Sequence, residues 1–216
     1  DLYICKLGTF QESVYDFAVE VVKNKYPVLR NPQRGIQYTV LDPLIQTLNF
    51  AYPTPNDRDS WTNTSLKSMY GKKGLQSCMF NKVDKNTKRR SISYRASTLE
   101  NFGRIFSPEE LPKYSGKISK FCNIVKKSNG IVLIYSQFID GGCVPIALAL
   151  EEMGFKRYGK NNSLMQNNDV EPINALTMQP HTGEGKFHQA SYIMITGDPI
   201  LSPDNNLELI ACTNEN

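Results

Sequence analysis

The polar side chains best suited to binding a ligand in this chain follow directly after its most apolar segment. Ser136 and Gln137 come near the end of residues 130–138, which are otherwise glycine, aliphatic or aromatic. An unbroken apolar, β-branched run of this length, flanked by glycines, predicts a strand buried on both faces of a parallel sheet. Open parallel sheets bind ligands at the carboxyl ends of their strands. We therefore expect Ser136 and Gln137 to lie at a ligand-binding edge.

A basic run forms a second group of residues suited to binding. Between residues 82 and 95, six cations face a single carboxylate, that of Asp84. The centre of the run is formed by Lys88, Arg89 and Arg90. A patch of this kind fits a polyanion such as nucleic acid, and Tyr94 with Arg95 could add stacking to it. A solvated basic loop explains the charge equally well.

The charge is unevenly distributed along the chain. The 216 residues carry a net charge of +4, but residues 162–216 hold one basic side chain against seven acidic ones. That segment therefore has a charge of −6, which leaves +10 on residues 1–161. A hydrophobic content of 40% is typical of a folded globular protein. No apolar stretch approaches the ~20 residues of a membrane span, and no leader pattern is present, so we expect no membrane contact and no secretion.

Cysteine and histidine usage does not indicate metal or nucleophile chemistry. The five cysteines are scattered singly, without a Cys-x-x-Cys pair, and both histidines lie in a loop-like, glycine-containing stretch. This pattern favours buried thiols in a reducing compartment over a disulfide or zinc framework. The sequence contains no Ser-His-Asp or Cys-His arrangement that supports catalysis. We expect no catalytic residue and no metal ligand in this chain.

The elements that must position these residues fall into two regions. Residues 1–112 are expected to be mainly helical and irregular. A first helix is predicted over residues 9–25, where Thr9 and Glu12 form a capping box. A second helix is expected over residues 40–50. Three irregular stretches should follow, namely a loop at 53–65 pinned by Trp61, a turn at 71–75 and a polar connection at 81–93.

Residues 113–216 are expected to form the start of an α/β domain. The pattern predicts, in order, an amphipathic helix at 113–127, the strand at 130–138, a helix at 142–153, a short buried strand at 191–196, and a last helix from Ser202 or Asp204 through Ala211. Alternation of helices and strands in this way is typical of a parallel α/β layout.

Several of these segments, in this order, resemble a known family. Residues 131–138, the helix at 144–154 and the sequence Ile195-Thr196-Gly197-Asp198 resemble the start of the second RecA-like lobe of superfamily 2 helicases. Within that superfamily the chain is most similar to the helicase-like ATPases of nucleocytoplasmic large DNA viruses, a group that includes poxvirus early transcription factor and nucleoside triphosphatase subunits and is related to Snf2-type translocases. The viral proteins carry stretches similar to residues 106–109, 114–118 and 146–155. The resemblance covers most of the chain, most strongly residues 99–211.

The resemblance implies a fold and a set of site residues. The expected fold is α/β, an incomplete RecA-like lobe with a parallel sheet, preceded by a mainly helical inter-lobe region. It implies that Ser136 and Gln137 face nucleic acid and that Thr196 and Gly197 form a neighbouring turn suited to phosphate contact. Hydroxyl, amide and bare backbone groups are good phosphate ligands that read no sequence. Alternatively, Ser136 caps the following helix and Gln137 satisfies loop amides.

The chain departs from the family pattern at the nucleotide motifs. Its nearest match to a phosphate loop, residues 154–161, lacks the final Ser or Thr, has bulky residues where the backbone must approach phosphate, and follows a helix instead of a strand. The acidic Asp-Glu motif and the arginine motif of the form Gln-x-x-Gly-Arg-x-x-Arg are both missing. ATP and Mg²⁺ are therefore expected in an intact parent protein, whereas this segment alone should not hydrolyse ATP.

Two functions follow from this reading of the sequence. In the first, the chain is part of an ATP-dependent helicase or translocase of a large DNA virus that acts in viral transcription. The chain would contact the backbone of nucleic acid, either DNA or RNA. Its partners would be the first RecA-like lobe of the same protein and viral RNA polymerase or virion components, in the host cytoplasm (viral factory) or the virion. The alternative is a non-enzymatic, degenerate helicase lobe that serves as a structural or interaction module.

Overall fold

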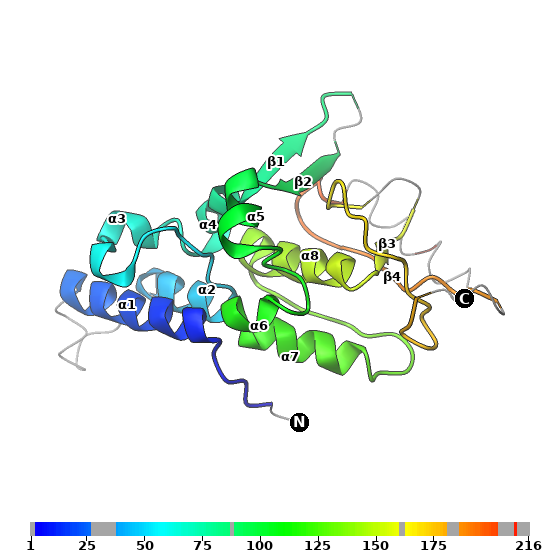
Figure 1. Ribbon diagram of the computed structural model, residues 1–216, viewed down its shortest axis with the longest axis horizontal. Coiled ribbons are helices and arrows are strands. Elements are labelled where there is room, and N and C mark those ends of the chain that lie inside the picture. Colours follow the sequence, from blue (N-terminus) through cyan, green and yellow to red (C-terminus); the bar gives the residue numbers. More distant parts are fainter. Residues whose placement is uncertain are drawn as a thin grey trace.

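The computed structural model of the chain describes residues 3–26, 38–86, 89–159, 163–180, 186–202 and 210 (Figure 1). Its α-helices are α1 (Thr9–Lys25), α2 (Asp42–Asn49), α3 (Asn63–Leu66), α4 (Gly71–Cys78), α5 (Ala96–Phe102), α6 (Leu111–Tyr114), α7 (Gly116–Val125) and α8 (Val144–Glu152). Shorter turns are the 3-10 helices η2 (Tyr38–Val40) and η3 (Arg58–Ser60) and the π-helical turn η4 (Ile139–Cys143). The strands are β1 (Met79–Val83), β2 (Arg90–Tyr94), β3 (Lys156–Arg157) and β4 (Ser191–Tyr192).

The first helix forms where its apolar spacing predicts it. Val14, Ala18 and Val22 recur at intervals of four residues and are buried, and the first two share a hydrophobic cluster with Ala51, Leu66 and Met69. The cap differs from the prediction by one position, because Thr9 is the first helical residue and the Gln11 side chain accepts from the backbone N–H of Gly8 at 3.2 Å. Glu12 therefore takes no part in the cap.

Aromatic packing fixes the segment between α2 and α4. The Trp61 ring lies 5.9 Å from the ring of Phe10 and 5.4 Å from that of Phe17, both on α1. The sequence prediction that Trp61 pins this region is confirmed. The segment also contains the 3-10 helix η3 and the short helix α3, and Thr62 caps α3 by accepting from the backbone N–H of Ser65.

The segment 71–94 differs from the sequence prediction. The expected turn at 71–75 is the helix α4, and the expected polar connection contains the antiparallel pair β1 and β2. The helix was missed because of its glycines. Gly74 faces the Tyr52 ring so closely that a Cβ would collide with it. Leu75 and Cys78 complete the same buried face. In the sequence, a glycine that allows close packing cannot be distinguished from a glycine that forms a turn.

The core lies around α8, which runs through the middle of the molecule (Figure 1). Nearly every residue of this helix is buried, including the acidic pair Glu151 and Glu152. The amphipathic segment predicted over residues 113–127 forms α6 and α7, which are separated at Ser115. The Ser115 hydroxyl accepts from the backbone N–H of Ile118 at 3.0 Å and so caps α7.

The strand predicted over residues 130–138 is not a buried strand in this chain. Ile131, Leu133 and Tyr135 are each at least 90% exposed, and Val132 and Ile134 are 39% and 40% exposed. The segment contains no β-strand, and none of the described strands pairs with it. A strand is buried on both faces only where neighbouring strands and covering layers flank it, and the described residues supply no flanking strand here.

The described fold is mixed α/β with two small sheets. β1 and β2 pair antiparallel over five residues, from Met79 opposite Tyr94 to Val83 opposite Arg90. β3 and β4 form a parallel pair of only two residues each, so the strand predicted at 191–196 is formed only at its start. A complete RecA-like parallel sheet is therefore not present in the described residues. The helix predicted from Ser202 or Asp204 through Ala211 lies almost entirely outside them.

Packing connects the two regions on either side of residue 112. One continuous hydrophobic cluster includes Phe50 and Ile92 from the first region and Ile118 and Leu148 from the second. None of the helices in the described part of the chain has the length and apolar character needed to cross a membrane.

Candidate nucleic-acid interface

Ser136 lies in a tight turn that leads into η4. Its hydroxyl donates to the carbonyl of Phe138 at 3.1 Å and accepts from the backbone N–H of the same residue at 3.3 Å. The hydroxyl also packs against Gly142, where any side chain would collide with it. The alternative role of Ser136, capping of the following helix, is not seen, because neither η4 nor α8 has a side-chain cap. Ser136 shapes the turn and is half-buried there.

Gln137 presents its side chain to solvent at the tip of the same turn. No hydrogen bond or ion pair among the described residues involves its amide group. An exposed amide next to a fixed turn can donate to a phosphate oxygen without first breaking an internal hydrogen bond. Of the two residues predicted at this edge, Gln137 is therefore the one available for contact.

Thr196 and Gly197 form a separate turn after β4. The Thr196 hydroxyl lies 3.1 Å from that of Ser202 and accepts from the backbone N–H of Asp198 at 3.2 Å. These hydrogen bonds keep the hydroxyl within its own turn. Gly197 is exposed, with open space where a Cβ would stand. Backbone contact with a ligand is possible at Gly197, whereas Thr196 has a structural role.

The basic run maps onto the β1–β2 hairpin. Arg89 is exposed, Lys88 lies outside the described residues, and Arg90 is buried to 8% exposure. The Arg90 guanidinium donates to Asn81 Oδ1 at 3.0 Å and to Asp140 Oδ1 at 2.6 Å. Arg90 therefore holds the hairpin in place, and contact with a polyanion falls to the exposed cations around it.

The ion pair between Arg90 and Asp140 joins two predicted site segments. Asp140 lies on η4, three residues after Gln137, and Arg90 begins β2 opposite Val83, next to the hairpin turn. This end of the hairpin is therefore tied to the structure that follows the Ser136 turn. The two side chains are only 6% and 20% exposed, which protects the pair from screening by salt. Removing one partner of such a pair costs about 3–5 kcal/mol. The structure thus brings the hairpin and the Gln137 turn together, whereas the described hydrogen bonds do not join the Thr196 turn to them.

A second ion pair, between Arg104 and Glu152, lies between α8 and the hairpin. Glu152 accepts from Arg104 Nε at 2.9 Å and from the hydroxyl of Tyr94 at 2.7 Å. Burial, together with the neighbouring Glu152 carboxylate, raises the pKa of Tyr94 far above its usual range. Tyr94 faces the core, and its ring contacts Phe106. Its predicted contribution to stacking is therefore not possible in this arrangement.

Sequence reasoning missed Glu151, which organises the segment after α8. Its carboxylate accepts from the backbone N–H groups of Leu164 and Met165 at 2.8 and 2.7 Å and from the hydroxyl of Tyr192 at 2.7 Å. Desolvation by burial raises the pKa of Glu151, and these hydrogen bonds only partly oppose it. An acidic pair inside an otherwise apolar helix was the available signal, because a buried carboxylate requires partners.

The nearest match to a phosphate loop does not form a phosphate cradle. Gly154 ends α8 with a φ of +93°, and the position of its missing Cβ is filled by the carbonyl of Glu171. The Gly154 carbonyl accepts from the backbone N–H of Ile173 at 3.2 Å. A phosphate would meet carbonyl oxygens here instead of N–H donors. The described residues of this stretch therefore do not fit a nucleotide phosphate, and Lys160 and Asn161 lie outside them.

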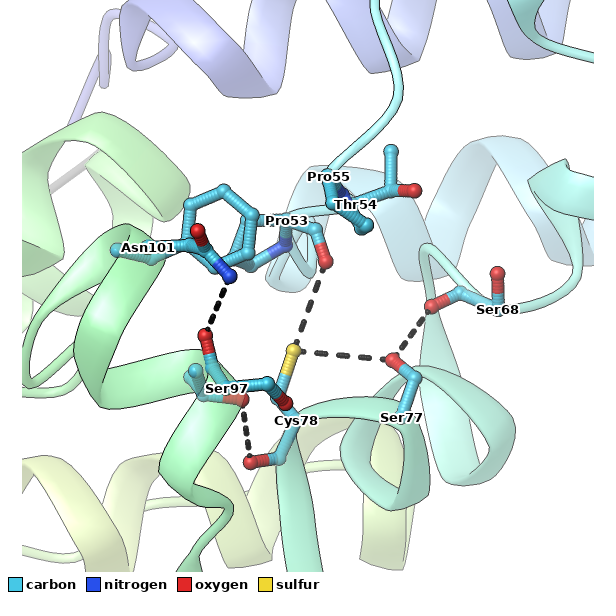
Figure 2. Close-up of a pocket in the computed structure, with 10 residues that line it drawn as sticks. Pro53, Thr54, Pro55, Ser68, Ser77, Cys78, Ser97 and Asn101 are labelled. Atoms are coloured by element: carbon cyan, nitrogen blue, oxygen red, sulfur yellow. Dashed lines mark hydrogen bonds between the residues drawn. The ribbon is translucent and has the colours of Figure 1, made fainter.

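A small cavity lies between α4, α5 and the segment before α3 (Figure 2). Its volume is about 200 Å³, and none of its lining residues is charged. The Cys78 thiol at its wall donates to the carbonyl of Pro53 at 3.6 Å and lies 3.7 Å from the Ser77 hydroxyl (Figure 2). Burial raises the pKa of Cys78 to about 11, so the thiol stays protonated and unreactive near neutral pH.

The described candidate site combines exposed cations on the hairpin with the exposed amide of Gln137. In the part of the chain that the structure describes, no three His, Cys, Asp or Glu side chains are grouped so that they could hold a metal ion. Comparison of the chain with models of known protein families, with curated proteins and with solved structures found no match in any of the three.

Proposed function

We propose that this chain is part of an ATP-dependent helicase or translocase of a large DNA virus that acts in viral transcription. In this proposal the chain contacts the nucleic-acid backbone and does not hydrolyse ATP by itself. ATP and Mg²⁺ would bind the intact protein, whose first RecA-like lobe, together with viral RNA polymerase or virion components, would be the partner. The resemblance of residues 131–138, 144–154 and 195–198 to the second helicase lobe gives the proposal its family.

The observation that carries the proposal is the ion pair between Arg90 and Asp140. Two segments predicted separately to contact nucleic acid, the basic hairpin and the Gln137 turn, are joined through it at 2.6 Å. Exposed cations beside an exposed amide are the groups that hold phosphates without reading bases. This arrangement supports a backbone-tracking surface.

The exposed segment 131–135 also supports a larger assembly. Five consecutive apolar side chains in water are unfavourable, and an unpaired extended segment offers backbone groups to a further strand. In the proposed parent protein, this segment would be covered and paired within the second lobe.

The test is substitution of Gln137 in the intact ATPase. Gln137→Ala should reduce nucleic-acid-stimulated ATP hydrolysis by roughly tenfold, the loss that corresponds to one hydrogen bond to a charged group worth about 1.5 kcal/mol, while basal hydrolysis changes less than about twofold. The matched control is Gln179→Ala, an exposed glutamine outside the proposed surface, which should change neither rate. An equal loss of basal and stimulated activity in Gln137→Ala would argue against a role in nucleic-acid coupling.

A non-enzymatic helicase lobe is the second candidate. The observation that favours it is the filled position at Gly154, which leaves the nearest phosphate-loop match without a cradle. The sequence of the complete reading frame distinguishes the two candidates. A phosphate loop before this chain and an arginine motif after it would establish the ATPase, whereas a frame without both would establish the interaction module.

A further inference from the structure

The outer face of the β1–β2 hairpin carries a set of side chains that the core does not use. Met79 and Ile92 point inward and are fully buried, whereas Phe80 is 44% exposed. Side chains alternate between the faces of a strand, so Lys82 shares the outer face with Phe80. The register places Ser93 opposite Phe80 and Ser91 opposite Lys82. One aromatic ring, one cation and two hydroxyls therefore lie on one surface.

The Phe80 ring is held in a defined arrangement with an arginine. The Arg95 guanidinium carbon lies 4.3 Å from the centroid of the Phe80 ring. Arg95 Nε also donates to the carbonyl of Gln76 on α4 at 2.9 Å, which anchors the guanidinium. The pair is therefore positioned before any ligand arrives, which lowers the entropy lost on binding.

The charge around this pair is mainly positive. Lys82 and Lys85 are exposed, and neither takes part in an ion pair among the described residues. The nearest carboxylate along the strand, that of Asp84, accepts from the backbone N–H of Asn86 at 2.8 Å in the hairpin turn. In Figure 1 the hairpin projects beyond α4 and α5. The exposure of Phe80, Lys82 and Lys85 leaves these side chains accessible to a ligand.

We propose that the outer face of the β1–β2 hairpin binds single-stranded nucleic acid, with one base stacked on the Phe80–Arg95 pair. Flat aromatic and guanidinium groups stack on bases of any sequence. Lys82 and the hydroxyls of Ser91 and Ser93 contact the flanking phosphates and sugars. The base must be free of its duplex to reach the ring, so single strands are preferred. This inference rests on the proposed function and adds a base-stacking position to its backbone contacts.

Two ligands separate stacking from charge. The full chain is titrated with a fluorescein-labelled oligothymidylate and with an abasic oligomer of the same length, which has the same phosphates but no bases. A length of about 12 nucleotides covers the site sizes typical of stacking surfaces. Phe80→Ala should weaken binding of the oligothymidylate by about fivefold to 100-fold and leave binding of the abasic oligomer within about twofold.

Matched variants guard against a folding effect. Phe80→Tyr keeps a flat ring and should bind as the wild type does, whereas Phe80→Leu keeps apolar bulk and should behave as Phe80→Ala. Leu99→Ala, which removes an equally exposed apolar side chain (44%), should change nothing. Lys82→Ala should weaken binding of both ligands equally and reduce the salt slope by about 0.7, as expected for one phosphate contact to a single strand.

The outcomes distinguish this inference from the proposed function. Wild-type affinity for the oligothymidylate in Phe80→Ala overturns the stacking site but leaves the backbone-tracking proposal intact. An equal loss for both ligands in that variant also overturns stacking, because it assigns Phe80 a structural role. No binding of either ligand by the wild type at low salt overturns both proposals.

Discussion

Two adjacent carboxylates on α8 perform different tasks because they leave the helix in different directions. Glu152 pairs with Arg104 and Tyr94 and braces the hairpin, whereas Glu151 accepts the backbone N–H groups of Leu164 and Met165. The Glu151 carboxylate accepts the hydrogen bonds that a neighbouring strand would otherwise accept, because one side chain satisfies two consecutive backbone N–H groups. An irregular segment is thereby fixed to the core without regular secondary structure.

Glu151→Gln tests this arrangement directly. The amide keeps the shape of the side chain but has only one acceptor oxygen, so one of the two backbone N–H groups would face an NH₂ donor. An unsatisfied buried donor costs about 1–3 kcal/mol, and we expect the free energy of unfolding to fall by that amount. Urea denaturation measures it. Glu100→Gln, on the exposed side of α5, should stay within about 0.5 kcal/mol of the wild type.

The pH dependence of the same variant has a definite sign. Burial raises the pKa of Glu151 above its usual 4.5, so the folded state binds a proton that the unfolded state has already lost. The stabilising contribution of this carboxyl is therefore complete below pH 4.5 and decreases as the pH rises through the folded-state value. Glutamine does not titrate. The deficit of Glu151→Gln should be largest below pH 4.5 and smaller at pH 7, and a deficit that grows with pH would show that hydrogen bonding outweighs burial.

The candidate site was only partly predictable from residue types. Ser136 and Gln137 were selected as the carboxyl end of a buried strand, and the structure places them in a turn after a segment that is neither a strand nor buried. The burial of Arg90 depends on Asp140, which lies 50 residues further along the chain. No local pattern carries that information, because the pairing arises only when the hairpin packs against η4.

At the scale of elements, helices with a regular apolar spacing were predicted well and strands were not. α1 and α7 follow the 3.6-residue period, which is local, whereas α8 was recognised from a continuous apolar run. The hairpin was missed because Arg90 occupies an inner position of β2. A charged residue at an inner position hides the alternation of apolar and polar side chains that identifies a strand in the sequence. The segment 130–138 was misassigned for the opposite reason: its composition suits a buried strand, but burial requires flanking strands that the described residues do not provide.

Leu133→Lys distinguishes the exposed segment from the buried strand that the sequence suggests. Leu133 is 93% exposed, so the charge should remain in water and the free energy of unfolding should change by less than about 0.5 kcal/mol. Self-association of the chain, measured by sedimentation velocity, should decrease because an apolar edge is interrupted.

Leu148→Lys is the matched control for that substitution. Leu148 is fully buried on α8, so a lysine there should destabilise the protein by several kcal/mol or prevent folding. A loss of similar size for Leu133→Lys would mean that residues 131–135 are buried in solution.

At the scale of the whole molecule, a single glutamine connects three distant segments. Gln11 is fully buried. Its Oε1 accepts from the backbone N–H groups of Gly8 and Gly116, and its Nε2 donates to the carbonyl of Thr47 at 2.9 Å. The N-terminal helix, α2 and the start of α7 therefore share one polar centre. Together with the hydrophobic cluster that spans residue 112, this centre should make unfolding cooperative.

The chain offers a direct measurement of that cooperativity. Trp61 is the only tryptophan and packs on α1, so its fluorescence reports the first region, whereas far-ultraviolet circular dichroism reports all helices. We expect both signals to give one coincident urea transition. Gln11→Ala should shift both together by at least about 2 kcal/mol, because it leaves buried backbone donors without an acceptor, whereas the exposed Gln166→Ala should shift neither. A Trp61 transition that precedes the circular dichroism transition would instead identify two independently unfolding units, as a domain boundary near residue 112 predicts.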